Sequence, residues 1–469
     1  MLRTIAFVLA MIVGIGAAAS SRFGGLLFYL WFALFRPQEW VWIDVEAFRL
    51  SLIAGSLFVL PCLLTGVWPN LTHPLSIGSL LFLATGFVAQ LNAVDPATGW
   101  FWLTFMSRQI VVSLLLITII NTPRRFTIAI AVMSCSLAFH ASKFGVGYLL
   151  RGGAQFNTDI GGAFGSTNEF ALAAGRLLFL LIAAAQNIGI PWARLGMLTA
   201  VPFTMLGIIS TFSRGGFLGV ACGGMLLIVL QRRRALAVCA IFVAVVLGYW
   251  FVPVPDTYVN RMNTIGTYDE VGDRSALGRL HFWQVAVTMV AAEPLGVGLR
   301  NFEKNYNRFD FLNGQFGVDR SVHSSYFQAL AETGYIGGAV FAWLMAYAFW
   351  ILLRVRKRSR LLSPNDSHFF LTSANAVLAS LTVFAVAGAF AAEMMNELNW
   401  FTFGLVAVLD RLSRSAVVAR DLGPDIAQPH ATNQTGWRPE IAARTGHSVA
   451  AARAVPAGHR TDWTRLQRK

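Results

Sequence analysis

The residues best suited to chemistry in this sequence are His323 and the polar side chains near it. His323 opens HSSYFQALAETGYIGG, a helical pattern that directly follows a polar stretch. A neutral imidazole can accept a proton from a hydroxyl, and the positive end of a helix dipole lowers the imidazole pKa. We therefore interpret His323 as a candidate general base. Glu393 and Glu397 are alternative proton acceptors, unless they belong to a solvated loop.

Positive charges also stand within or beside apolar runs, where they are unusual. They are Arg108, Lys143, Arg151, Arg176 and Arg214. A charge at the centre of a membrane span costs about 2.5–3.5 kcal/mol on insertion scales, so it usually lines a cavity or is paired. The alternative is that these side chains extend to the interface. Guanidinium groups match phosphate oxygens bidentately, so the anion we expect here is a diphosphate on a membrane lipid.

Two of the arginines lie beside glycines at predicted helix starts. Arg214 belongs to TFSRGG, where free backbone N–H groups and small residues favour either an anion or close helix packing. Arg279 belongs to GRLHFW, at the first turn of a helix predicted over 276–291. The predicted apolar face of this helix consists of Leu280, Trp283, Val287 and Val290. We expect this face to lie on the membrane, with Arg279 binding either a substrate or lipid headgroups.

The surrounding chain must supply membrane helices. The 469 residues are 56% hydrophobic and 13% charged, compared with about 25% charged in soluble domains. We find twelve or thirteen apolar runs, at 4–20, 22–36, 48–66, 75–92, 103–121, 126–147, 168–187, 194–212, 214–231, 234–253, 325–353, 370–392 and 397–410. The predicted fold is an all-α polytopic membrane bundle with one large helical loop on the outer, periplasmic side.

Basic residues set the predicted orientation. The net charge of +14 gathers in short loops and the tail, so it indicates cytoplasmic loops and not nucleic-acid binding. The predicted parts are membrane helices at 1–253, a periplasmic loop at 254–324, membrane helices at 325–412 and a disordered cytoplasmic tail at 413–469. Helix parity puts the N-terminus outside if runs 4–20 and 22–36 both span; otherwise one is interfacial or re-entrant. Residues 1–20 also resemble a signal peptide, but we favour an uncleaved helix.

No metal or cofactor is expected. The best acidic candidate is Asp269–Asp273, but Arg274 follows it directly and no D-x-D pair lies beside His323. The nearby arginines can supply the positive charge that a metal would bring.

Together these motifs resemble a known family. FGSTNEFA, TFSRGG, GRLHFW with PLGVG, and HSSYFQALAETGYIGG occur in the order typical of the O-antigen ligase/polymerase family of bacterial inner membranes. FYLWFALFRPQEWVW resembles the branch described as putative O-glycosylation ligases of exosortase systems. The resemblance covers most of residues 1–410.

The resemblance implies inverting transfer of a glycan from an undecaprenyl diphosphate carrier to an acceptor hydroxyl, without metal. The family's helix-end arginine corresponds to Arg214, its loop arginine to Arg279 or else Arg300, and its histidine to His323, with Ser324 as the usual polar neighbour. Arg176 and Arg108 are further candidate substrate-binding residues. Partners would be the lipid-linked glycan, a lipid, protein or polysaccharide acceptor, and membrane lipid.

Three other functions remain open at this point. A polymerase would join repeat units with the same machinery and differ only in its acceptor. A flippase or transporter of lipid-linked glycans would also contain intramembrane cations, but it would not need a folded outer loop ending in a histidine. A scaffold without catalysis is the third.

Overall fold

The described residues fold entirely into helices and the segments that connect them. The computed structural model describes residues 2–41, 48–155, 164–231, 234–235, 238–239 and 274–422. Its principal helices are α1 (Leu2–Ser20), α2 (Arg22–Phe35), α3 (Pro37–Trp40), α4 (Leu50–Leu64), α5 (Pro74–Ala89), η2 (Gln90–Asn92), α6 (Pro96–Ile119), α7 (Pro123–Leu150), α8 (Thr167–Asn187), α9 (Pro191–Ser210), α10 (Arg214–Leu230), α13 (Arg274–Ala292), α14 (Phe302–Phe309), α15 (Ser325–Ser359), α16 (Pro364–Ala387) and α17 (Glu397–Leu422). Every predicted apolar run except 234–253 coincides with one of them.

Many of these helices are long and apolar enough to cross a membrane. Eight described helices meet both conditions, and α2, α4 and α10 are shorter apolar helices. The all-α polytopic membrane fold is therefore confirmed. The run at 234–253 lies almost wholly outside the described residues, so the total of twelve or thirteen spans stays a prediction.

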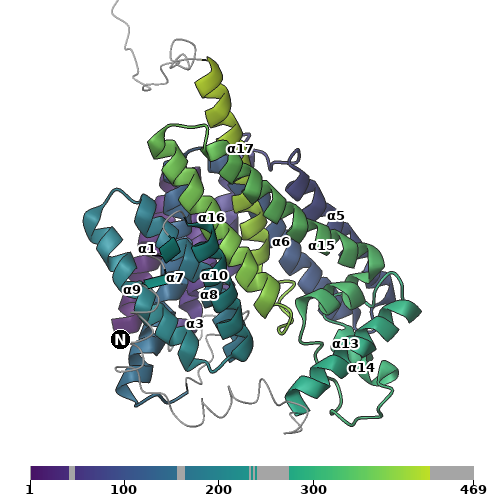
Figure 1. Cartoon of the computed structure of the whole chain (residues 1–469). Helices are drawn as coiled ribbons and strands as arrows, with labels where there is room; N and C mark the ends of the chain where they lie inside the picture. Colours follow the sequence, from purple (N-terminus) through teal and green to yellow (C-terminus); the bar gives the residue numbers. More distant parts are fainter. Residues whose placement is uncertain are drawn as a thin grey trace, which may run out of the picture.

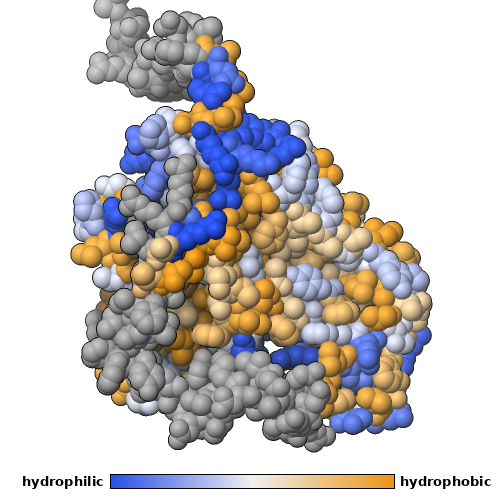
Figure 2. Space-filling model, viewed as in Figure 1, coloured by the Kyte–Doolittle hydropathy of each residue, from blue (hydrophilic) through white to orange (hydrophobic). Residues whose placement is uncertain are grey.

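The molecule has a basic end and an opposite end that carries α13 and α14 (Figure 1). A strongly hydrophilic band covers the basic end, and apolar surface dominates the middle (Figure 2). Asp410, which is 1% exposed, holds the basic end together. It accepts bonds from Arg358 at 2.6 Å and Arg414 at 2.7 Å and lies 3.3 Å from His73. The predicted orientation, with this basic end in the cytoplasm and α13 and α14 outside, stays a prediction.

Helices α1 and α2 form an antiparallel pair joined at Ser21, which caps α2 by accepting from the Gly24 N–H. The start of α2 lies at the basic end, since the Arg125 guanidinium lies 5.3 Å from the Phe23 ring centroid. Phe35, at the other end of α2, packs on His140 of α7. The chain begins at the end of the molecule that also carries α13 (Figure 1), and whether both helices cross the membrane stays a prediction.

Helix α15 is broken at Gly334, and the segment before α14 docks on the break. Gly334 has φ +73° and ψ −176° within the helix. The carbonyls of Ala331 and Glu332 instead accept from the N–H groups of Val297 and Gly298, at 3.0 and 3.1 Å. A Cβ on Gly334 would lie 2.3 Å from the Pro294 carbonyl oxygen, so only glycine fits.

The predicted helix at 276–291 exists as α13, and its predicted lipid-facing side is only partly free of protein contact, because Val290 is 0% exposed. Leu280 and Val287 are 46% and 49% exposed. The buried face begins at Phe282 and continues with Val285, Ala286 and Met289, which pack with Phe302, Tyr306 and Val322. Because the loop has this small core of its own, α13 packs its Phe282 side against α14 and α15. Leu280 and Val287 remain exposed.

Helix α17 continues past the predicted domain boundary at 412. Ser413 is buried, and Arg420 donates to the Leu361 carbonyl at 2.7 Å, which ties the last turns to the α15–α16 connection. Residues 413–422 are therefore helical and not disordered as predicted. The rest of the predicted tail, 423–469, lies outside the described residues.

Candidate active site

A small cavity at the end of the bundle that carries α13 brings Arg214 and Arg279 together. Its remaining lining comes from α8, the α9–α10 turn and the end of α16, as Asn168, Ser213, Gly215, Gly216, Ala387, Phe390 and Ala391. The cavity volume is ≈ 30 Å³. Arg214 stands 65 positions before Arg279, so the fold creates this pair of cations.

The α9–α10 turn fixes where Arg214 lies. Phe212 adopts φ +56°, a left-handed conformation that reverses the chain within the turn. Ser213 then caps α10, accepting from the Gly216 N–H at 3.2 Å and donating to the Asn168 Oδ1 at 2.7 Å. A Cβ on Gly216 would lie 2.5 Å from the Ala171 Cβ, so this glycine lets α10 approach α8 closely. Arg214 is the first residue of a helix whose positive end faces the cavity.

Helix α13 brings Arg279 from the other side of the cavity and carries an aromatic contact. Trp283, one turn after Arg279, stacks on Phe327 of α15 with ring centroids 5.3 Å apart. It also lies 6.3 Å from Phe390, which lines the cavity. The indole N–H of Trp283 is buried without a partner among the described residues. The three rings hold α13 against the membrane helices beside the cavity.

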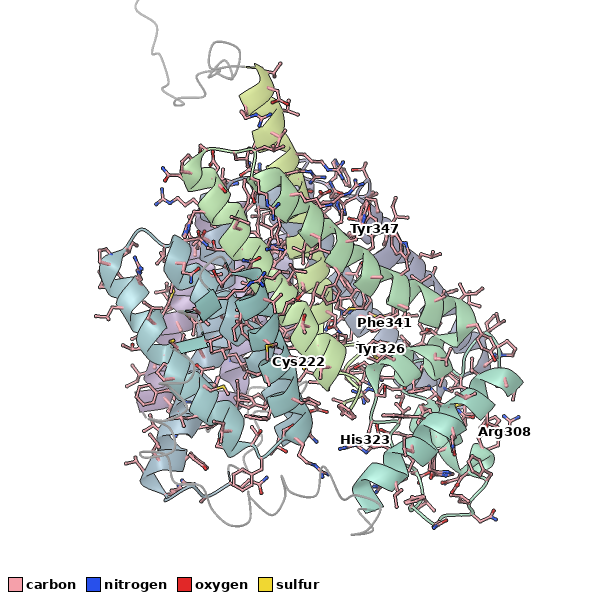
Figure 3. All side chains as sticks on the ribbon, in the orientation of Figure 1. Cys222, Arg308, His323, Tyr326, Phe341 and Tyr347 are labelled. Carbon is pink, nitrogen blue, oxygen red and sulfur yellow. The ribbon has the colours of Figure 1, made fainter. Side chains whose placement is uncertain are left out.

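His323 lies between α13 and the start of α15 (Figure 3), with its ring centroid 6.0 Å from that of Phe282, and the charge of Arg279 acts on it. Its backbone has φ +47°, an uncommon conformation for a residue other than glycine. Burial and, to a lesser extent, the positive charges of Arg279 and Arg320 together lower its pKa to about 4. The imidazole is therefore neutral at ordinary pH and free to accept a proton. The sequence predicted a lowered pKa, but from a helix dipole and not from burial and two arginines.

The residues after His323 are clamped to the α16–α17 connection. The Ser325 N–H donates to the Gly388 carbonyl at 2.8 Å, and its hydroxyl donates to the Ala391 carbonyl at 2.8 Å. The Glu393 N–H donates back to the Ser325 hydroxyl at 3.0 Å. Since Ala391 lines the cavity, these bonds fix the distance from His323 to the cavity wall.

Ser324 and the two acidic alternatives to His323 are buried. Ser324 is 1% exposed and lies at the N-cap of α15, although its hydroxyl makes no capping bond. Glu393 is 4% exposed, and burial raises its pKa well above the usual carboxyl value, with the neighbouring Glu169 carboxylate acting in the same direction. The Asn396 side chain donates to the Glu393 carboxylate at 2.7 Å, and Glu393 does not line the cavity. Glu397 is also 4% exposed and does not line the cavity.

Arg176, a predicted substrate-binding residue, is enclosed by protein. It is 1% exposed. Its guanidinium donates to Asn399 Oδ1 at 2.7 Å, to the Leu398 carbonyl at 2.9 Å and to the Thr402 hydroxyl at 2.9 Å. Its remaining face lies 4.9 Å from the Phe384 ring centroid. The side chain thus ties α8 to α17 and α16 and does not reach the cavity lining.

Arg300 and Arg108 also lie outside the cavity lining. The Arg300 guanidinium lies 4.7 Å from the Trp102 ring of α6, and its backbone N–H bonds to the Glu332 carboxylate. Arg108 was predicted near the outer end of a helix; it lies instead near the middle of α6, because α6 begins at Pro96 and not near 103. It lines a different groove, between α2, α4 and α6.

Some residues of the site were missed or misread in the sequence. Asn168 was interpreted as a helix cap, but Ser166 caps α8 in a capping box with Glu169, which leaves Asn168 to hold Ser213. Arg320 was not singled out, yet its charge acts on His323. The capping box could have been recognised, because Ser and Glu three positions apart are its signature. The Arg320 contact depends on the fold of the loop.

Comparison with known families agrees with this geometry. Residues 198–342 match a family described as O-Antigen ligase, and residues 2–170 match a family of unknown function. No curated protein matches the chain. The first match contains Arg214, Arg279, Arg300 and His323, and it ends within α15. The predicted family is therefore confirmed: this polytopic membrane protein carries an O-antigen ligase domain.

Proposed function

We propose that this protein transfers a glycan from a lipid diphosphate carrier, undecaprenyl diphosphate, to an acceptor hydroxyl at the outer end of the bundle. The observation that supports it best is the pairing of Arg214 and Arg279 in one cavity with the neutral His323 beside Arg279. Two guanidinium groups suit the two phosphates of the carrier, and a neutral imidazole suits an acceptor that must lose a proton. We also place the protein in the inner membrane, in the exosortase-associated branch.

In the proposed reaction the acceptor oxygen forms a bond to the anomeric carbon as the bond from that carbon to the diphosphate oxygen breaks. His323 takes the hydroxyl proton, and the lipid diphosphate leaves as an anion. Arg214 and Arg279 stabilise the negative charge that develops on it. Attack from the face opposite the leaving group inverts the anomeric carbon.

Donor binding also changes the charge around His323. The negative donor then partly cancels the positive charge around His323. Because that charge lowers the imidazole pKa, donor binding raises it toward neutrality, where a general base is most effective.

Reconstitution tests this proposal directly. Purified protein in proteoliposomes is supplied with an undecaprenyl diphosphate glycan and separate acceptors: a glycolipid, a peptide with free hydroxyls, and a second copy of the glycan. We expect release of undecaprenyl diphosphate together with a glycosylated acceptor of inverted anomeric configuration. Extension of the lipid-linked glycan alone would identify a polymerase. Movement of the donor across the bilayer without release of diphosphate would contradict the proposal in favour of a transporter.

A further inference from the structure

A second, largely apolar groove opens between α2, α4 and α6, on elements that do not line the Arg214 cavity. Its volume is ≈ 300 Å³, and its lining includes Tyr29, Ser51, Gly55, Arg108 and Gln109. Ser51 is the second residue of α4, which starts at the outer end of the bundle. The groove therefore lies in the outer half of the membrane.

Gln109 indicates that this groove holds a ligand. Its side chain is 1% exposed, yet neither its amide nitrogen nor its carbonyl oxygen has a hydrogen-bond partner among the described residues. A buried amide without partners costs about 1–3 kcal/mol, so native proteins seldom leave one unsatisfied. Because Gln109 lines the groove, a group bound there can supply the missing bonds.

Arg108 gives the groove its charge. It lies on the exposed side of α6, twelve positions after Pro96. Across the described part of the chain no hydrogen bond or ion pair to its guanidinium is found. Trp100 and Phe101, at 45% and 62% exposed, mark the outer interface of α6 about two turns nearer its start. Helical side chains point toward the N-terminus, so the guanidinium extends outward toward lipid headgroups.

The rest of the groove suits a hydrocarbon chain. Leu52, Val59, Leu60 and Phe105 line it with Val111 and Val112. A polar end near Ser51 and Arg108, joined to an apolar lining, is the pattern that a lipid requires. Unlike the Arg214 cavity, this groove has one arginine and not two, which matches a single phosphate better than a diphosphate.

We propose that this groove binds an anionic phospholipid of the outer leaflet, with its phosphate on Arg108 and Gln109 and one acyl chain along α4 and α6. The site does not depend on the proposed transfer reaction, because it shares no lining residue with the Arg214 cavity. A bound phospholipid would join α2, α4 and α6 and stabilise the folded protein by mass action.

Native mass spectrometry of delipidated protein with added phosphatidylglycerol measures the binding. We expect Arg108→Gln to weaken it at least about tenfold, or about 1.4 kcal/mol. Lys143→Gln is the matched control, since Lys143 is also an exposed cation within a span, on α7, beside a groove that is otherwise largely apolar. Lys143→Gln should leave binding unchanged.

Gly55→Leu gives a second variant that keeps every charge. A Cβ on Gly55 would meet only the Tyr29 ring, at 3.5 Å, so a larger side chain fills the groove with little strain in the backbone. We expect loss of both phosphatidylglycerol binding and its stabilisation against heat. Equal binding by Arg108→Gln and the unaltered protein would overturn the proposal. Binding of polyprenyl diphosphate in preference to phosphatidylglycerol would also overturn it and would assign the groove to the donor.

Discussion

Arg176 and Arg214 stand out equally in the sequence, yet they occupy opposite kinds of environment. Arg176 is fully enclosed, and three groups of α17 accept its hydrogen bonds. Arg214 begins a helix at the edge of a cavity that a second arginine also lines. The difference shows that an arginine of an apolar run can either be enclosed by neighbouring helices or line a cavity.

Arg176 and Arg214 differ in the side chains that surround their guanidinium groups. Asn399 and Thr402 meet Arg176 from positions more than 220 residues away, and no acidic side chain is needed because neutral oxygens accept all three bonds. At the Arg214 cavity the second side chain, Arg279, brings more positive charge. Two guanidinium groups that line one space suit a substrate anion with two phosphates.

The largest effect should come from His323→Ala, which removes the base and leaves both types of arginine in place. A general base contributes about 10²–10⁴-fold in rate. We expect a loss in that range, measured as glycan transfer in proteoliposomes, with normal membrane insertion. His323→Gln serves as a control for side-chain volume and should be equally inactive. Activity within a few-fold of the unaltered protein would direct attention to Glu393 or Glu397.

Arg176→Met should instead destabilise the fold. It leaves the Asn399 oxygen buried without a donor, which costs about 1–3 kcal/mol. We expect a lower thermal midpoint in detergent, and folded protein that still binds the donor. If this variant kept its thermal midpoint but lost donor binding, Arg176 would belong with Arg214 and the contrast between them would fail.

Arg214→Lys keeps the positive charge but removes the planar guanidinium group with its parallel N–H donors. Because Lys is a single point charge, it cannot make two parallel bonds to a phosphate. We expect about a tenfold loss in kcat/KM with an unchanged thermal midpoint. Full activity would mean that Arg214 contributes only positive charge at a helix end.

The sequence predicted the helices and the residues of the pocket better than it predicted the groups that surround them. Apolar runs fix a membrane helix because no other open structure satisfies its backbone in lipid, so twelve predicted runs coincide with described helices. Arg214, Arg279 and His323 were singled out and do come together. The burial of Arg176 and the position of Arg300 against Trp102 depend on contacts between distant segments, which a single sequence does not record.

The pH dependence gives a finer test of the pocket. With a folded pKa of about 4, His323 is neutral across the usual assay range, so kcat/KM for the free enzyme should stay flat near neutrality and fall only below about pH 5, as the imidazole becomes protonated. Arg279→Gln removes one positive neighbour, so the imidazole pKa should rise and the acid limb should move to higher pH. Arg176→Met should not move it. If kcat/KM of Arg279→Gln falls at the same acidic pH as that of the unaltered protein, Arg279 does not act on His323.

The smallest expected effect concerns metal removal. The two arginines that line the cavity can neutralise a leaving diphosphate, which is the task a divalent ion performs in other phosphate chemistry. We therefore expect EDTA to leave transfer by the purified protein unchanged within experimental error, and Asp269→Ala and Asp273→Ala to be mild. These two residues lie outside the described part of the chain. Assays with EDTA, with EDTA followed by excess Mg²⁺, and without additions separate the cases. Activity abolished by EDTA and restored by Mg²⁺ would show that Arg214 and Arg279 alone do not neutralise the leaving diphosphate. The contrast between Arg176 and Arg214 would then no longer explain where the diphosphate binds.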